Sequence, residues 1–176
     1  MKGGPRSEPT TETGGLRHAH GGRTRAAGDQ PLPRAAAPAS DVLQQGGGFG
    51  ARRIAAGDHS IFFRCALGSA AQSLAVVLVH GLGLSGRYML PTARHLAPHF
   101  PVYVPDLPGF GGSSKPAKAL DVPALADALA AWIRAMELAP AALLGNSFGC
   151  QVIADVGARH PDLVERAVLQ GPTAPP

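Results

Sequence analysis

The stretch that decides the fold runs from Ala141 to Gly149 and reads Ala-Ala-Leu-Leu-Gly-Asn-Ser-Phe-Gly. Its first four residues form an apolar run with the length of a buried strand, and the next five match the pattern G-x-S-x-G. A serine on a sharp strand-to-helix turn has a strained backbone, and its neighbours two residues away must lack bulk so that strand and helix can approach. Gly145 and Gly149 meet that need, which predicts a tight turn at Ser147.

A helix follows the turn, because apolar side chains recur at helical spacing at Cys150, Val152, Ile153 and Val156. Pro161 ends this helix just after His160. Ser147 therefore lies at a helix N-terminus, where free N–H groups and the macrodipole stabilise an anionic intermediate of the kind that acyl transfer generates. The competing interpretation is an ordinary glycine-bounded turn in which Ser147 only caps the helix.

Composition divides the 176 residues into two parts. Residues 1–48 hold few large apolar side chains and many Gly, Pro, Ala, Thr and Arg residues, so they are expected to form a disordered leader. Residues 49–176 are expected to form one domain. The net charge is +4, but Lys and Arg are scattered and aromatic residues are few, which argues against a nucleic-acid partner.

Location and cofactors are predicted from what the sequence lacks. The leader has no continuous apolar segment of the signal-peptide type, and the longest apolar run, 74–79, is too short to span a membrane. We expect a cytoplasmic protein with no membrane partner. Cys65 and Cys150 are too few for a disulfide framework or a zinc site, so no metal and no cofactor is predicted. A nucleophilic Cys150 remains an alternative to Ser147.

The rest of the chain alternates extended and helical patterns. Two extended segments flank a Gly57-Asp58 turn within residues 51–67 and predict a hairpin. Strands are then predicted at 74–79, 102–104, 141–144 and 167–169, with helices from Pro91 and from Asp121, an expected N-cap. This order predicts an α/β fold with a mostly parallel sheet and flanking helices, opened by a β-hairpin.

A rival motif, G-x-G-x-x-G, occupies residues 81–86 between the 74–79 strand and the next helix. Asp106 follows about twenty residues later, where a dinucleotide-binding protein has its ribose-binding acid. His80 before the first glycine, Pro91 shortly after the third and the Pro-Gly turn after Asp106 count against this alternative.

Three loops in order, His80-Gly81-Leu82-Gly83, Asp106 to Ser113 and Gly145 to Gly149, resemble those of the α/β-hydrolase family. The resemblance implies that Ser147 is the catalytic nucleophile and that the backbone N–H groups of Leu82 and Phe148 form the oxyanion hole. Structural roles are implied for the other motif residues, namely His80, Gly81, Gly83, Asp106, Gly109, Gly111, Gly145 and Gly149.

The resemblance also narrows the chemistry. A serine at the elbow implies an esterase, a thioesterase, a carbon–carbon bond hydrolase or a cofactor-free peroxidase acting on a small-molecule substrate. The family order is Ser, then acid, then His, yet only about thirty residues follow Ser147. His160 lies at the far end of the elbow helix, about 20 Å away at the helical rise, so it is not the base.

The sequence is therefore expected to be the N-terminal half of a hydrolase domain, an incomplete α/β-hydrolase core without the lid, the triad acid and the histidine, and inactive alone. A triad of Ser147, His80 and Asp106 is the alternative within this chain. A catalytically dead binding module that uses an open sheet edge after Val168 is the alternative in function. The sequence predicts neither the substrate nor the oligomeric state.

Overall fold

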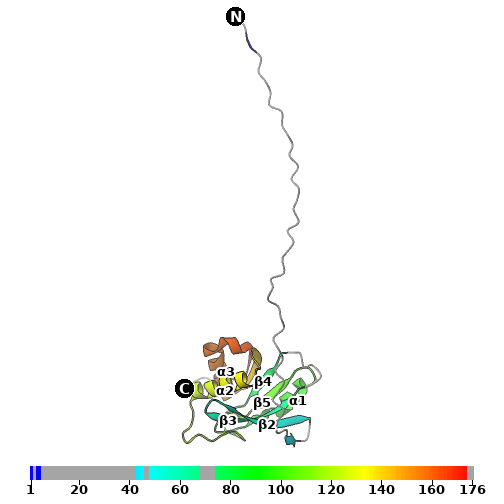
Figure 1. Cartoon of the computed structure of the whole chain (residues 1–176), viewed down its shortest axis with the longest axis vertical. Coiled ribbons are helices and arrows are strands. Elements are labelled where there is room, and N and C mark those ends of the chain that lie inside the picture. The colour runs from blue at the N-terminus through cyan, green and yellow to red at the C-terminus, as the bar shows by residue number, and fades with distance from the viewer. Residues whose placement is uncertain (2, 5–42, 46–47, 68–73, 174–176) are drawn as a thin grey trace. The chain divides into compact units, whose positions relative to one another are not determined.

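The computed structural model describes residues 1, 3–4, 43–45, 48–67 and 74–173. Most of the predicted leader, residues 1–48, lies outside these residues. The described chain from residue 43 onward contains a seven-stranded sheet in the order β1-β2-β3-β5-β4-β6-β7 (Figure 1). Its strands are β1 Leu43–Gln45, β2 Phe49–Ala56, β3 His59–Ala66, β4 Val76–Val79, β5 Val102–Pro105, β6 Ala141–Asn146 and β7 Val164–Gln170.

The predicted hairpin opens the sheet. Strands β2 and β3 pair antiparallel around the Gly57-Asp58 turn, where Gly57 has a φ of 55° that favours glycine. Strand β1, residues 43–45, lies within the predicted leader and pairs antiparallel with β2.

The four strands after the hairpin run parallel, as predicted. Strand β4 lies between β5 and β6, and β7 pairs with the outer side of β6. Strands β4 and β5 are buried along their whole length, because helices cover both faces of the sheet. Parallel strands place their carboxyl ends at one edge, so the loops after β4, β5 and β6 meet there.

Two apolar clusters fill the space between sheet and helices. Helix α1, Leu90–Leu96, follows a 3₁₀ turn at Gly86–Met89 and packs on one face, with Ala93 fully buried. Helices α2, Val122–Ala135, and α3, Phe148–Arg159, pack on the other face (Figure 1). Trp132 of α2 is fully buried there, edge-on to Phe63 of β3 with ring centroids 5.4 Å apart.

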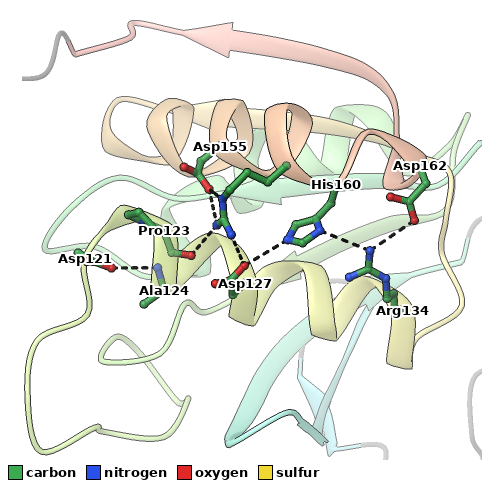
Figure 2. A network of polar contacts seen from close by, with 9 residues as sticks. Asp121, Pro123, Ala124, Asp127, Arg134, Asp155, His160 and Asp162 are labelled. Atoms are coloured by element: carbon green, nitrogen blue, oxygen red, sulfur yellow. Dashed lines mark hydrogen bonds and ion pairs between the residues drawn. The ribbon is translucent and has the colours of Figure 1, made fainter.

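Helix α2 begins where the sequence predicts. The Asp121 side chain accepts a hydrogen bond of 2.9 Å from the Ala124 N–H, which is the N-cap that the sequence predicts (Figure 2). Pro123 occupies the first turn, where it costs no hydrogen bond. Within the described residues, no helix is long and apolar enough to cross a membrane.

A surface network joins α2 to the C-terminal end of α3 (Figure 2). Arg159 is its centre: its guanidinium donates to Asp155 on its own helix, to Asp127 of α2 at 2.5 Å and to the Pro123 carbonyl at 2.8 Å. His160 adds a contact of 3.2 Å to Asp127. These bonds connect α2 with α3, the helix whose N-cap is Ser147.

Candidate active site

Ser147 occupies the turn between β6 and α3. Its backbone has φ 52° and ψ −119°, a positive φ that a side chain makes unfavourable. Such a residue costs about 1–3 kcal/mol and persists only where its surroundings hold it. Here the Ser147 N–H donates to the Gln170 carbonyl at 2.9 Å, and the Ser147 carbonyl accepts from the Cys150 N–H at 2.9 Å.

The two flanking glycines leave no room for a side chain. A Cβ added to Gly145 would lie 2.6 Å from the Gly149 carbonyl oxygen. A Cβ added to Gly149 would lie 2.5 Å from the Val79 carbonyl oxygen. Both neighbours are backbone atoms, so they cannot move aside without shifting β4 or α3. The physical reason for expecting glycine at both positions is confirmed.

The Ser147 hydroxyl is half-buried and makes no capping hydrogen bond to α3. It has no hydrogen-bond partner anywhere in the described part of the chain. The interpretation of Ser147 as an ordinary helix cap is therefore wrong, because a cap needs that bond. The strained turn presents a serine hydroxyl that the fold does not use.

The loop after β4 approaches this serine from the side. A Cβ added to Gly81 would lie 3.4 Å from the Ser147 Cβ, which places the loop in van der Waals contact with the turn. The Leu84 N–H donates to the Gly81 carbonyl at 3.3 Å, and Gly83 has a φ of 71°. Leu82 lies at the tip of this turn and is 65% exposed.

Two backbone N–H groups beside Ser147 remain free. Phe148 is the first residue of α3, so its N–H has no partner within the helix. Neither this N–H nor that of Leu82 donates to another group in the described residues. Leu82 and Phe148, the residues of the two predicted oxyanion donors, line the same pocket.

His80 is fully buried behind the loop. Its Nδ1 donates to the Gly81 carbonyl at 2.9 Å, and its Nε2 accepts from the Leu107 N–H at 3.0 Å. Burial lowers the pKa of His80, while the Gly81 carbonyl and Asp106 act against it, so the neutral ring that these bonds require is favoured. His80 therefore joins the β4 and β5 loops.

Asp106 is fully buried and holds the loop after β5. Its carboxylate accepts from the Gly86 N–H and the Gly112 N–H, each at 2.7 Å, and its Oδ1 lies 3.3 Å from Arg64 Nη1. A Cβ added to Gly111, which has a φ of 48°, would lie 1.9 Å from Asp106 Oδ2. Gly109 also has a positive φ, 90°, as the predicted turn demands.

This arrangement argues against the alternative that residues 81–86 bind a dinucleotide. The third glycine of that motif, Gly86, donates its N–H to Asp106 instead of leaving it free for a phosphate. Asp106 is inaccessible to a ribose, and α1 spans only seven residues after a 3₁₀ turn. The motif residues connect two loops and do not form a phosphate-binding site.

The alternative triad is not assembled either. The polar atoms of His80 and Asp106 already interact with loop backbone groups and with Arg64. In particular, His80 Nε2 already accepts a hydrogen bond from the Leu107 N–H. His160 lies beyond the C-terminal end of α3, about 20 Å from Ser147 at helical rise, in the network of Figure 2. No imidazole of the described residues makes a hydrogen bond to the Ser147 hydroxyl.

Cys150 is buried in the first turn of α3, with its Sγ 3.1 Å from the Gly145 carbonyl. A buried thiol that donates to the backbone is not a nucleophile, so the Cys150 alternative is wrong. The described residues also contain no group of three His, Cys, Asp or Glu side chains that could hold a metal ion.

A cavity of about 300 Å³ opens beside the two free amides, and we call it the Phe148 pocket. Phe148 and Leu82 line it, together with residues of the β5–α2 segment and the first turn of α2. Those further residues are Pro108, Gly109, Phe110, Lys115, Pro116, Lys118, Ala119, Leu120 and Leu125. The volume is at the lower end of the range for small-molecule sites.

Sequence reasoning missed the residues that support and extend this site. Arg64 was not singled out, although an arginine within the apolar run Ile61–Cys65 signals a buried ionic partner. Lys115 and Lys118 of the Phe148 pocket had no such signal, because a lysine in a Pro- and Gly-rich loop is ordinarily solvated.

Comparisons with known proteins agree with this fold. A family model described as the alpha/beta hydrolase fold matches residues 75–176, more than half of the chain. Among curated proteins, (E)-2-((N-methylformamido)methylene)succinate hydrolase of Acinetobacter baylyi is 33% identical over 97 residues, 54% of this chain and 37% of that protein. Pimeloyl-[acyl-carrier protein] methyl ester esterase of Chromobacterium violaceum is 39% identical over 94 residues, 53% of this chain and 35% of that protein.

Solved structures extend the likeness to the fold. A thermophilic esterase from Thermogutta terrifontis superposes with a TM-score of 0.64 at 27% identity, over 72% of this chain and 47% of that one. The chain thus spans little more than a third of the length of these two curated relatives, and less than half of the esterase.

Proposed function

Because this chain belongs to the alpha/beta hydrolase fold family, we propose that it carries the nucleophile and oxyanion hole of a serine hydrolase. Ser147 is the nucleophile, and the N–H groups of Leu82 and Phe148 bind the oxyanion. The observation that supports this most is the strained Ser147 turn, whose hydroxyl and neighbouring amides have no partner among the described residues. The substrate is a small molecule with an ester, a thioester or a cleavable carbon–carbon bond.

The reaction begins with attack of Ser147 Oγ on the substrate carbonyl. A base takes the hydroxyl proton, and the carbonyl oxygen becomes an anion that the Leu82 and Phe148 N–H groups stabilise. The tetrahedral intermediate collapses to an acyl-enzyme with loss of the leaving group, which receives the proton. Water then attacks the acyl-enzyme by the same path and releases the acid.

The base is the part that the described residues do not supply. The polar atoms of His80 are engaged, and His160 lies at the wrong end of α3. We therefore expect the triad acid and histidine from further sequence in the whole protein, and negligible hydrolysis by the 176 residues alone. Loss of the base leaves binding and the oxyanion hole, and with them only a residual rate.

Covalent mapping tests the role of Ser147. The chain is incubated with p-nitrophenyl acetate and imidazole, which serves as an external base, and acetylated peptides are identified by mass spectrometry. We expect acetyl transfer to Ser147 that is faster than transfer to Ser85, a half-buried serine on a nearby loop and thus the internal reference. Equal rates at the two serines would contradict the proposal.

A binding or interaction module is the second candidate. It is favoured by one observation: β7 is the outer strand of the sheet, and both Val168 and Leu169 are about half exposed, at 54% and 49%. An unreactive Ser147 in the mapping experiment, together with capture of a partner chain along β7, would support this candidate instead.

A further inference from the structure

The Phe148 pocket has walls of two kinds. Its apolar walls come from the leucines and phenylalanines of three segments, with Leu82 and Phe148 beside the serine. Its charged lining residues are two lysines, Lys115 and Lys118, and no Asp or Glu lines it. A cleft lined by one sign of charge with low-dielectric walls attracts ligands of the opposite sign.

The positive charge of this pocket is not neutralised within the described chain. Lys115 Nζ donates to the Gly111 carbonyl at 2.9 Å and to the Ser113 carbonyl at 3.2 Å, so its position is fixed while its charge has no carboxylate partner. Lys118 is exposed and makes no hydrogen bond or ion pair with the described residues. One ammonium is held in place, and the other is free to reach a ligand.

From this juxtaposition we propose that the Phe148 pocket binds an apolar acyl chain that carries a carboxylate, and that Lys118 is the residue that selects for the negative charge. The inference rests on the proposed function, because it assigns a substrate class to the pocket lined by Phe148, the residue next to Ser147. The chain lies against Leu82, Leu120 and Phe148, while the carboxylate pairs with Lys118 in the field of Lys115. The substrates are thus half-esters or thioesters of dicarboxylic acids in preference to their neutral analogues.

Equilibrium binding of octanoate and octanamide tests the inference. The two probes share one chain and differ in charge, and their dissociation constants are measured by amide chemical-shift titration of the full 176-residue chain at low salt. Octanoate is expected to bind about fivefold more tightly than octanamide, the size of a partly exposed ion pair. This ratio falls toward one as salt is added.

Two variants and a matched control locate the effect. Lys118→Met is expected to reduce the ratio to about one without weakening octanamide binding. Arg94→Met removes the same charge from an exposed position on α1 outside the pocket, and the ratio stays unchanged. Ala119→Trp places a large side chain at an exposed lining position and weakens binding of both probes.

Each of the following results would overturn the inference: no binding of octanoate, equal affinities for the two probes, a ratio that survives Lys118→Met, or binding that survives Ala119→Trp. The readout does not depend on the nucleophile, because Ser147→Ala is expected to bind both probes like the native chain. An unreactive Ser147 with Lys118-dependent binding would therefore refute the proposed function and leave the binding site. A reactive Ser147 without this binding would overturn the inference about the pocket and leave the proposed function.

Discussion

At the scale of single residues, Ser147 combines an unfavourable backbone with an unused hydroxyl. Replacement by glycine relieves the positive φ, whereas replacement by alanine keeps it. We expect Ser147→Gly to be about 1 kcal/mol more stable to unfolding than Ser147→Ala, after allowance for the greater chain entropy of glycine. Urea denaturation of both variants measures this difference. A less stable glycine variant would mean that the turn is not strained.

The Leu82 N–H offers a test of the oxyanion hole that leaves the serine intact. Leu82 is exposed at the tip of its loop, and proline at this position removes the N–H while alanine keeps it. We expect Leu82→Pro to slow acetylation of Ser147 by about 10²-fold relative to Leu82→Ala, as for other lost oxyanion donors. Equal rates in the two variants would exclude the Leu82 N–H as a donor.

His80 makes stability depend on pH. Burial lowers its pKa in the folded chain, whereas an unfolded histidine titrates near about 6.5. Below that pH the unfolded chain binds a proton that the folded chain does not, so the free energy of unfolding falls as pH decreases from about 6.5 toward the folded-state pKa. Thermal melts from pH 7.5 to pH 5 measure the fall.

The variant His80→Gln is expected to lose this pH dependence, at a cost of about 1–3 kcal/mol for the disturbed bond to Leu107. His95→Gln, a change on the exposed side of α1, serves as the control and keeps the native slope. A slope that survives in His80→Gln would assign the pH dependence to another group.

At the scale of elements, the packing of α3 against β4 depends on one glycine. Gly149 and Gly157 both lie in α3, but a Cβ at Gly149 would meet the Val79 carbonyl oxygen at 2.5 Å, and a Cβ at Gly157 meets nothing within 4 Å. We expect Gly149→Ala to destabilise the chain by about 3 kcal/mol through overpacking. Gly157→Ala should stabilise it by about 0.5–1 kcal/mol through helix propensity.

The two alanine variants share one helix and one chemical change, so each is the control for the other in urea denaturation. Similar effects on stability would show that Gly149 is not at a close approach between α3 and β4.

Helices were the most predictable elements of this chain. The Asp121 cap, the proline at position 123 and the apolar spacing of α2 are local signals, and the structure confirms them. The glycines at 145 and 149 were predictable because their requirement is steric and local to one turn. Strand β1 was not predictable, because its pairing with β2 depends on backbone hydrogen bonds that composition does not encode.

The site was predictable only in part. Motif spacing indicated the serine, the two amide positions and the loop-bracing role of Asp106. The partners of Asp106 were not indicated, since Arg64 and Gly86 lie 42 and 20 residues away along the chain. The Phe148 pocket is likewise a product of tertiary structure, because it joins the β4 loop, the β5–α2 segment and the start of α3.

At the scale of the whole molecule, the outer edge of β7 is unpaired within the described residues, and its apolar side chains are exposed. Such an edge promotes association. We expect the 176-residue chain to self-associate with increasing concentration in sedimentation velocity experiments, and Val168→Lys to reduce this association. Leu67→Lys, at an exposed leucine outside β7, is the control and has little effect. A monomeric native chain at all concentrations would contradict this role for β7.

The central claim is that the chain holds the nucleophile and the oxyanion hole, while its described residues supply no base. Turnover of p-nitrophenyl butyrate, with and without added imidazole, tests it directly in the native chain and in Ser147→Ala. We predict no difference between the two proteins without imidazole, and a faster native chain with imidazole. Serine-dependent turnover without imidazole at about 1 s⁻¹ or above, an ordinary enzymatic rate, would show that the chain has its own base. Identical rates with imidazole would show that Ser147 is not the nucleophile.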